Sequence, residues 1–457
     1  MSFIERYQEL ELLRFMTCGG VDHGKSTLLG RLLFDSRSVP EDHLAPAKRN
    51  DELDFAMLLD GLRAEREQGI TIDVAYRYFR TTKRKFIIAD APGHEQYTRN
   101  MATAASNCDL AVVLVDAREG IVEQTRRHSF IAALLGIKHL VIAVNKMDLV
   151  ERSEEHFDSI RRAYDAFAAR LEVTDVEFIP MVASTGENVV HRSPLMEWYG
   201  GRPLLDHLEN VHIASDRNLI DLRLPVQLIL RGDDGSRHIA GTIASGVIRV
   251  GDEVSVLPAQ TTARVRGIAE RPEGFAPLAL AITLDRDVDV SRGDMLAHVR
   301  NIPTLSGDIE AMLVWMSAEP LQRGREYLLQ HCATQTPAVV RDIRYRIEVT
   351  ELRRHPADQL QMNEIGRVRI EASRRIAFDA YARNRATGAF ILIDRMTGET
   401  AAAGMILDRE TAVEELTNPP ASFAAIEKLL AEYGLDAEAI EEVTAKIASL
   451  LGSSHDG

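Results

Sequence analysis

The feature that most constrains the fold of this 457-residue chain is a pair of glycines separated by four residues and followed by a lysine and a serine. They are Gly19, Gly24, Lys25 and Ser26. In a loop of this spacing, glycines let backbone N–H groups wrap around phosphate groups, and the helix that follows adds its positive N-terminal end. The apolar run LLRFMTCG precedes the loop and a helical pattern follows it. The segment therefore predicts a strand, a phosphate-binding loop and a helix in succession.

The chemistry of this loop assigns roles to two of its side chains. Lys25 is expected to reach the β- and γ-phosphates, and the Ser26 hydroxyl is expected to bind Mg²⁺. The residues expected to contact the nucleotide here are Gly19, Gly20, Val21, Asp22, His23, Gly24, Lys25, Ser26 and Thr27.

A second motif, DAPGH, follows the apolar run KFIIA. Asp90 ends that run, where its carboxylate can reach Mg²⁺ through a water. Gly93 can offer its backbone N–H to the γ-phosphate, and His94 stands next to an attacking water. On its own, His94 would be better explained as a solvated loop histidine. Ala91 and Pro92 complete the expected nucleotide-contacting segment.

A third motif, Asn145-Lys146-Met147-Asp148, follows another apolar run. The Asp148 carboxylate offers two acceptors for the N1–H and N2–H₂ donors of guanine, and adenine presents no such pair. Lys146 can lay its aliphatic stem along the base. N-K-x-D alone is common, but the three motifs in this order, each after a predicted strand, indicate GTP.

Thr71, in the segment EREQGITID, supplies one more expected part of the site. Its position favours a switch threonine whose hydroxyl meets Mg²⁺ only when the γ-phosphate is present; the alternative is an ordinary strand threonine. Such segments order and disorder with the γ-phosphate, which converts hydrolysis into movement.

The apolar pattern predicts an α/β domain with a doubly wound, mostly parallel sheet over residues 1–211. Asp206–Asp221 is polar and is expected to be a linker. Short alternating runs then predict two antiparallel β-barrel domains, over 221–304 and 305–410. Residues 418–457 return to a helical period and predict a short C-terminal helical tail.

Composition limits the class of protein. The net charge of −15 disfavours a surface that grips nucleic acid throughout. The three cysteines Cys18, Cys108 and Cys332 include no C-x-x-C pair, which fits a reducing cytosol. The chain has neither a signal-peptide pattern nor an apolar run of membrane-spanning length. We therefore expect a soluble, cytoplasmic protein.

The motifs resemble those of the translational GTPases typified by elongation factor Tu. The stretches LLDGLRAEREQGITIDVAYRYF and ADAPGHEQYTRNMATAASNCDLAVVLVDAREGIVEQTRRHSFIAALLGIKHLVIAVNKMDLV resemble more closely the GTPase subunit of bacterial heterodimeric sulfate adenylyltransferase. The resemblance implies a smaller catalytic partner subunit that makes adenosine 5′-phosphosulfate and pyrophosphate from ATP and sulfate. GTP hydrolysis by this chain would drive that uphill reaction.

The resemblance also assigns residues. His94 would be catalytic together with Lys25 and Thr71, and Mg²⁺ would be bound by Ser26, Thr71 and Asp90. Val21 and Ile70 match an apolar pair that flanks the catalytic histidine. The last guanine motif would contribute Ala183 and Ser184.

The sequence departs from this pattern at three places. Gly20 and His23 are closer to the elongation-factor pattern than to the Ser and Asp expected at these positions in the sulfate adenylyltransferase subunit. Val182-Ala183 replaces the usual Ser-Ala, which keeps a backbone N–H for the guanine O6 and loses the serine hydroxyl. The tail over 418–457 has no counterpart in the resemblance, and no second phosphate loop for a fused adenylylsulfate kinase occurs after residue 30.

Two other readings stay open from the sequence. A translation-factor-like GTPase would need a basic surface for tRNA or the ribosome, and the barrels do contain arginine-rich strings such as VVRDIRYRIEV. A regulatory GTPase would use its tail to dock an unrelated partner.

Overall fold

The computed structural model describes residues 11–20, 22–36, 48–49, 52–53, 55, 74–92, 97–171, 173, 175–213, 218–232, 235–269 and 271–408. The chain divides into two compact units, Met1–Ile406 and Leu407–Gly457. The helical tail predicted for residues 418–457 lies outside the described residues.

A six-stranded sheet forms the core of the N-terminal domain, with the strand order β4-β5-β1-β6-β7-β8. Neighbouring strands are parallel except for β4, which is antiparallel to β5. The doubly wound, mostly parallel sheet predicted from the sequence is confirmed. The strands are β1 Leu12–Gly19, β4 Ala75–Arg80, β5 Lys85–Asp90, β6 Leu110–Asp116, β7 His139–Asn145 and β8 Asp175–Pro180.

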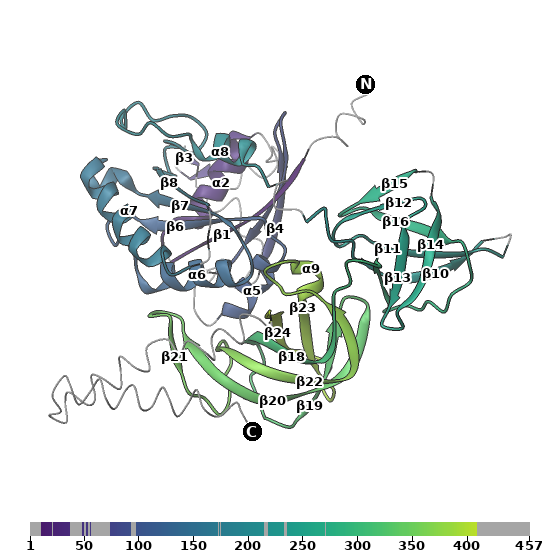
Figure 1. The fold of residues 1–457 in the computed structure, drawn as a ribbon. Coiled ribbons are helices and arrows are strands. Elements are labelled where there is room, and N and C mark those ends of the chain that lie inside the picture. The colour runs from purple at the N-terminus through teal and green to yellow at the C-terminus, as the bar shows by residue number, and fades with distance from the viewer. Residues whose placement is uncertain are drawn as a thin grey trace, which may run out of the picture. The chain divides into compact units, whose positions relative to one another are not determined.

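Helices cover both faces of this sheet (Figure 1). Figure 1 shows α2 and α8 on one side and α5 and α6 on the other. Every residue of β6 is buried, as a central strand covered on two faces requires. The helical segments of this domain are α2 Lys25–Asp35, α5 Thr98–Ser106, α6 Glu123–Leu134, the 3₁₀ turn η2 Met147–Val150, α7 Glu154–Ala168 and α8 Leu204–Asn210.

The predicted linker over Asp206–Asp221 is wrong at its start. Helix α8 runs to Asn210 and buries Leu204, Leu205 and Leu208. Two of these leucines precede residue 206. The segment that begins at Asp206 therefore contains only part of the apolar face, and its helical periodicity cannot be recognised from that segment alone.

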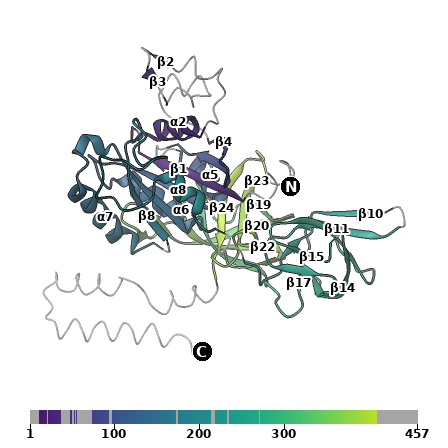
Figure 2. The ribbon, with the colours of Figure 1, turned by 90° about the horizontal axis from the view of Figure 1, so that it is seen from above.

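The first antiparallel sheet has the order β10-β11-β16-β14-β13-β17-β9. The continuous segment Leu224–Arg231 closes it, because its start pairs with β17 and its end pairs with β11. Strands β10 and β11 run side by side as a hairpin (Figure 2). The strands are β9 Leu224–Pro225, β10 Leu228–Arg231, β11 Arg237–Thr242, β12 Val247–Arg249, β13 Glu253–Leu257, β14 Thr261–Ile268, β15 Glu273–Phe275, β16 Ala279–Leu284 and β17 Met295–His298.

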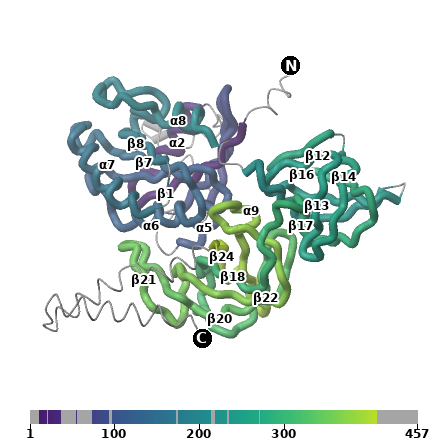
Figure 3. Tube along the Cα trace, viewed as in Figure 1, coloured from purple at the N-terminus to yellow at the C-terminus, as the bar shows by residue number. Residues whose placement is uncertain are grey.

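The second antiparallel sheet, through which Figure 3 follows the chain in green and yellow, is a closed barrel. Its order is β19-β23-β24-β18-β22-β20-β21, and a β19–β20 pairing closes the ring. Trp315 and Tyr327 pack edge to face in its core. The strands are β18 Thr304–Trp315, β19 Glu326–His331, β20 Thr334–Glu348, β21 Arg353–His355, β22 Ile365–Phe378, β23 Ala389–Asp394 and β24 Thr400–Ile406; the short pair β2 Lys48–Arg49 and β3 Glu52–Leu53 lies earlier in the chain.

The segment between β22 and β23, residues 379–388, contacts both other domains. The Tyr381 hydroxyl donates to the Leu135 carbonyl at 2.8 Å. Arg385, the first residue of helix α9 (Arg385–Gly388), donates to carbonyls at the C-terminal end of α5, including that of Ser106 at 3.1 Å. Asp379 accepts two 2.8 Å hydrogen bonds from the buried Arg223. This segment therefore connects the second barrel to the α/β domain and to the first barrel.

Candidate functional site

The loop between β1 and α2 contains two residues in the left-handed backbone region. Asp22 has φ 64° and Gly24 has φ 91°. A Cβ atom at Gly24 would lie 2.6 Å from the Asn145 Nδ2 atom, so only glycine fits at this position. The tight turn then starts α2 at Lys25, as the motif predicts.

The Lys25 ammonium lies inside this loop. Its Nζ donates to the carbonyl oxygens of Gly19 at 3.0 Å and Gly20 at 3.4 Å. Burial lowers the pKa of Lys25, and the nearby Asp90 carboxylate opposes that shift. A phosphate would offer this cation an anionic acceptor stronger than a neutral carbonyl.

Asp90 ends β5 beside the loop, and its carboxylate is buried. It pairs in register with Thr17 of β1, whose hydroxyl donates to Asp90 Oδ1 at 3.1 Å. Thr17 was missed from the sequence, although its place opposite the motif aspartate on the neighbouring strand was a usable signal. Ser26 is partly exposed in the first turn of α2.

The Ser26 hydroxyl and the Asp90 carboxylate are oxygen ligands of the kind that Mg²⁺ prefers. The described residues contain no group of three or more His, Cys, Asp and Glu side chains able to hold a metal ion. Mg²⁺ is bound through one or two protein oxygens, several waters and substrate phosphates, and a hydroxyl with one nearby carboxylate suits that pattern.

Asn145 joins the phosphate loop to the last guanine motif. Its Nδ2 donates to the His23 carbonyl at 2.9 Å, and its Oδ1 accepts the Ala183 N–H at 2.9 Å. The Ala183 N–H is thus already engaged, and it must share or leave this acceptor to bind a guanine O6. Asp148 is exposed in η2, and Met147 beside it is buried.

His23 is held on three sides. Its Nδ1 lies 3.1 Å from the Gly20 nitrogen and 3.1 Å from the Leu114 carbonyl oxygen, and its Nε2 lies 3.2 Å from a carboxylate oxygen of Glu119. Glu119 was also missed from the sequence, because it lies in a loop without a named motif.

The segment after β8 is anchored by an ion pair. Arg152 donates to both carboxylate oxygens of Glu187, at 2.8 and 3.0 Å. These bonds, against the opposing effect of burial, lower the pKa of Glu187 to about 2. The Ser184 carbonyl accepts from Arg31 of α2 at 3.3 Å. Ala183 and Ser184 therefore lie beside the phosphate loop and its helix.

The structure brings together the phosphate loop, Asp90, the motif that begins at Asn145, and Ala183. All of them follow the carboxyl ends of neighbouring parallel strands, which is where open α/β sheets bind ligands. Val21, Thr71, Gly93 and His94 lie outside the described residues, as does Ile70.

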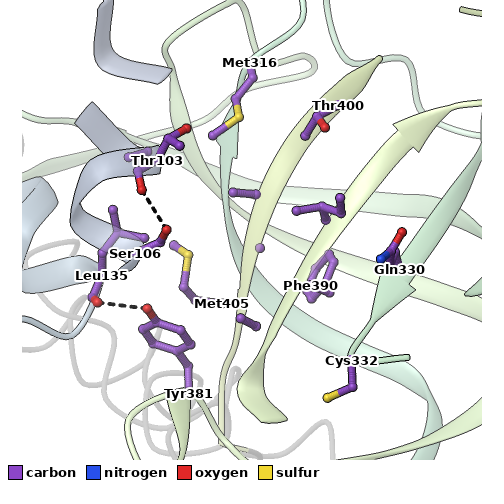
Figure 4. Close-up of a pocket in the computed structure, with 15 residues that line it drawn as sticks. Thr103, Ser106, Leu135, Met316, Gln330, Cys332, Tyr381, Phe390, Thr400 and Met405 are labelled. Atoms are coloured by element: carbon purple, nitrogen blue, oxygen red, sulfur yellow. Dashed lines mark hydrogen bonds between the residues drawn. The ribbon is translucent and has the colours of Figure 1, made fainter. Parts of the chain in front are cut away.

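A hollow of about 440 Å³ lies between α5 and the second barrel (Figure 4). Figure 4 shows Met405 and Phe390 beside it and the Tyr381–Leu135 hydrogen bond at one side. Its lining is mainly apolar, and burial raises the pKa of the Cys332 thiol to about 12. We assign it no chemistry.

The arginine-rich strings of the second barrel are ion-paired across strands. Glu310 on β18 accepts from Arg367 at 2.9 Å and from Arg344 at 3.0 Å. Further cross-strand pairs join Asp308 to Arg369 and Glu371 to Arg341, and Asp342 pairs with Arg344 within β20. These pairs compensate the charge of Arg341, Arg344, Arg367 and Arg369, which weakens the case for a basic nucleic-acid-binding face.

The chain matches two family models. Residues 10–218 match the elongation factor Tu GTP-binding domain, and residues 308–407 match the GTP-eEF1A C-terminal domain-like family. Fold and site thus define a GTP-binding protein of the elongation factor Tu class.

Similar proteins of known name identify the family within this class. Sulfate adenylyltransferase subunit 1 of Teredinibacter turnerae is 50% identical over 419 residues, which cover 89% of this chain and 90% of that protein. The same subunit of Saccharophagus degradans is 48% identical, covering 93% and 92%. The bifunctional enzyme CysN/CysC of Rhodopirellula baltica is 52% identical, covering 90% of this chain and 66% of that longer protein. The chain belongs to the sulfate adenylyltransferase subunit 1 family, which confirms the predicted resemblance.

Within the described part of the chain, no helix combines the length and the apolar character needed to cross a membrane. The cysteines Cys18, Cys108 and Cys332 are all free thiols.

Proposed function

We propose that this chain is the GTP-hydrolysing subunit of a sulfate adenylyltransferase. It would couple GTP hydrolysis to the formation of adenosine 5′-phosphosulfate and pyrophosphate from ATP and sulfate. The observation that carries the proposal is 50% identity to a sulfate adenylyltransferase subunit 1 over nine-tenths of that protein, together with a phosphate loop folded beside a guanine motif.

We infer a separate role for each part of the site. Lys25 would bind the β- and γ-phosphates, and the backbone of Gly19–Ser26 would wrap them. Asp148 would accept from guanine while Asn145 holds the base-binding segment against the phosphate loop. Ser26, Asp90 and Thr71 would hold Mg²⁺, which supplies charge neutralisation at the phosphates. His94 would orient the attacking water.

The subunit naming of the relatives supports a partner. We infer that the partner is the smaller catalytic subunit, which would bind ATP and sulfate, because this chain has one phosphate loop and its base-reading motif is for guanine. Domain boundaries at 1–211, 221–304, 305–410 and 418–457 are part of the same proposal. The free cysteines are compatible with the reducing cytoplasm that we infer for it.

The test is reconstitution with purified components. The full-length chain with ATP, sulfate and GTP should yield no adenosine 5′-phosphosulfate until the catalytic subunit is added. Product formation should then depend on GTP, and Lys25→Met should abolish the GTP effect while preserving assembly. Robust product from the single chain, or GTP-independent product from the complex, would contradict the proposal.

The translation-factor alternative is less well supported. It needs an uncompensated basic face on the barrels, and the cross-strand ion pairs at Asp308, Glu310 and Glu371 oppose this. A filter-binding titration with tRNA should detect no specific complex.

A further inference from the structure

We propose that Asp116 is a positioning residue for the guanosine nucleotide: its carboxylate holds the Lys146 ammonium so that the lysine stem is fixed in place for the base. This inference rests on the proposed GTP site. Asp116 is the last residue of β6 and lies directly opposite Asn145 in the β6–β7 register. It therefore ends its strand beside the guanine motif, although no motif names it.

Lys146 is held at its charged end by two oxygens. Its Nζ donates to Asp116 Oδ2 at 2.8 Å and to the carbonyl oxygen of Asp22 in the phosphate loop at 2.5 Å. Lys146 itself has φ 62°, a left-handed conformation that turns the chain between β7 and η2. The ammonium thus bridges the end of β6 and the phosphate loop.

Fixing this side chain before the nucleotide arrives has an energetic consequence. A free lysine loses rotamer entropy when its stem is immobilised. In this chain the loss is incurred on folding, because the ammonium is bonded without a ligand. The base then meets a stem that is already placed, and preorganisation of this kind strengthens binding.

The Asp116 carboxylate is suited to this task because it is buried yet charged. Its side chain is 1% exposed, against 25% for Lys146. Burial raises the pKa of Asp116, but hydrogen bonds from Arg118 and Lys146 outweigh burial and hold the pKa below its usual range. The carboxylate therefore stays ionised at neutral pH.

Arg118 is the second cation on the same carboxylate, and it provides the control. Its Nη2 donates to Asp116 Oδ2 at 2.7 Å and its Nε to Oδ1 at 3.1 Å. Its side chain is half-exposed, and these two bonds go to Asp116 and not to the phosphate loop. If Asp116 acts through Lys146, the loss of Arg118 should leave nucleotide binding intact.

The local backbone is bonded to Asp116 through its main-chain carbonyl and through its side chain, because the Arg118 N–H donates to Asp116 Oδ1 at 2.9 Å, an oxygen that asparagine also offers. The N–H groups of Glu119 and Gly120 donate to the Asp116 carbonyl at 3.1 and 3.0 Å. Asp116→Asn preserves that carbonyl and the side-chain shape, and it removes the negative charge that holds the ammonium.

The experiment is a double-mutant cycle in the full-length protein, read as the dissociation constant for GDP with Mg²⁺ and as GTPase kinetics. Asp116→Asn and Lys146→Met should each weaken GDP by roughly tenfold, and the double variant should bind like either single variant. The KM for GTP should rise by the same factor with kcat within about twofold, because the lysine stem contributes equally to ground-state and transition-state binding. Arg118→Gln should change neither quantity by more than about twofold.

Other outcomes overturn the inference. Unchanged GDP affinity in Asp116→Asn, or losses that multiply in the double variant, would uncouple Asp116 from Lys146. Equal weakening by Arg118→Gln would show that the carboxylate acts through Arg118, and this arm decides the matter even if Asp116→Asn does not fold. Failure of the wild-type chain to bind guanosine nucleotides would instead contradict the proposed function.

Discussion

Asp148 stands exposed in η2, next to the buried Met147 that anchors the turn. We predict that Asp148→Asn moves preference from guanosine to xanthosine triphosphate. An aspartate accepts from the guanine N1–H and 2-amino group, whereas asparagine offers an N–H₂ donor that suits the xanthine carbonyl. Hydrogen bonds to a charged group contribute about 1.5–3 kcal/mol each, so GTP should weaken by roughly 10²–10⁴-fold.

A competition titration of the two triphosphates against wild type and variant measures this preference. Xanthosine triphosphate should still support Mg²⁺-dependent hydrolysis, because the phosphate loop is unchanged. A variant that still prefers GTP would remove Asp148 as the base reader.

His94 lies outside the described residues, and its proposed role gives a second residue-scale prediction. His94→Ala should leave the GTP dissociation constant near that of wild type, because the expected phosphate contacts come from Gly19–Ser26. Hydrolysis in the presence of the partner subunit should fall by about 10²-fold or more, the scale of a lost positioned catalytic group. Single-turnover hydrolysis of bound GTP measures it, and an unchanged rate would assign the role elsewhere.

At the scale of elements, the buried pair of Arg223 and Asp379 connects the two barrels. Their side chains are 1% and 4% exposed, and two 2.8 Å bonds join them. Removing one partner leaves the other charge buried and uncompensated, so Arg223→Met should destabilise the protein by about 3–5 kcal/mol. Urea unfolding followed by fluorescence reports this, since Trp315 lies in the core of the second barrel.

The matched control is Arg249→Ala, which breaks the exposed pair with Glu273 in the first barrel. An exposed pair contributes about 0–1 kcal/mol, so this variant should unfold close to wild type. Similar urea midpoints for the two variants would show that the buried pair does not hold the barrels together.

The sequence predicted the parallel strands well because each buried strand is an unbroken apolar run, as in β6 and β7. It missed β4, whose Tyr76 and Tyr78 are exposed at the sheet edge and give no apolar run. It also missed α5, where small and polar residues (TRNMATAAS) hide the buried face formed by Met101 and Ala105.

The site was predicted where a motif has a fixed local spacing, as at Lys25, Asp90 and Asn145. The residues that hydrogen-bond to the motif side chains were not predicted. Thr17, Asp116 and Glu119 reach the site through strand register and loop packing between segments distant in the sequence. One rule could have found Asp116: it ends a strand that lies next to β1 and β7, and the carboxyl ends of such strands meet.

For the whole molecule, we predict that the tail over 418–457 is a docking or self-association element. Its apolar residues recur at helical spacing, and two short helices cannot bury both apolar faces alone. A chain ending at residue 408 should assemble more weakly with the catalytic subunit and should bind GDP with unchanged affinity. Light scattering during size-exclusion chromatography measures assembly, and normal assembly of the shortened chain would make the tail dispensable.

Closure of the second barrel through β19 and β20 bears on how the molecule aggregates when heated. A closed ring offers no row of unpaired backbone groups to a neighbouring molecule. In the described part of the chain, several strands, including β4, β8, β10 and β21, have one strand neighbour, and of these β4 carries the most exposed large apolar side chain, Tyr78, with 69% of its surface exposed. Intermolecular strand pairing on heating should therefore begin at β4, and a lysine in place of Tyr78 should delay turbidity without altering the barrels.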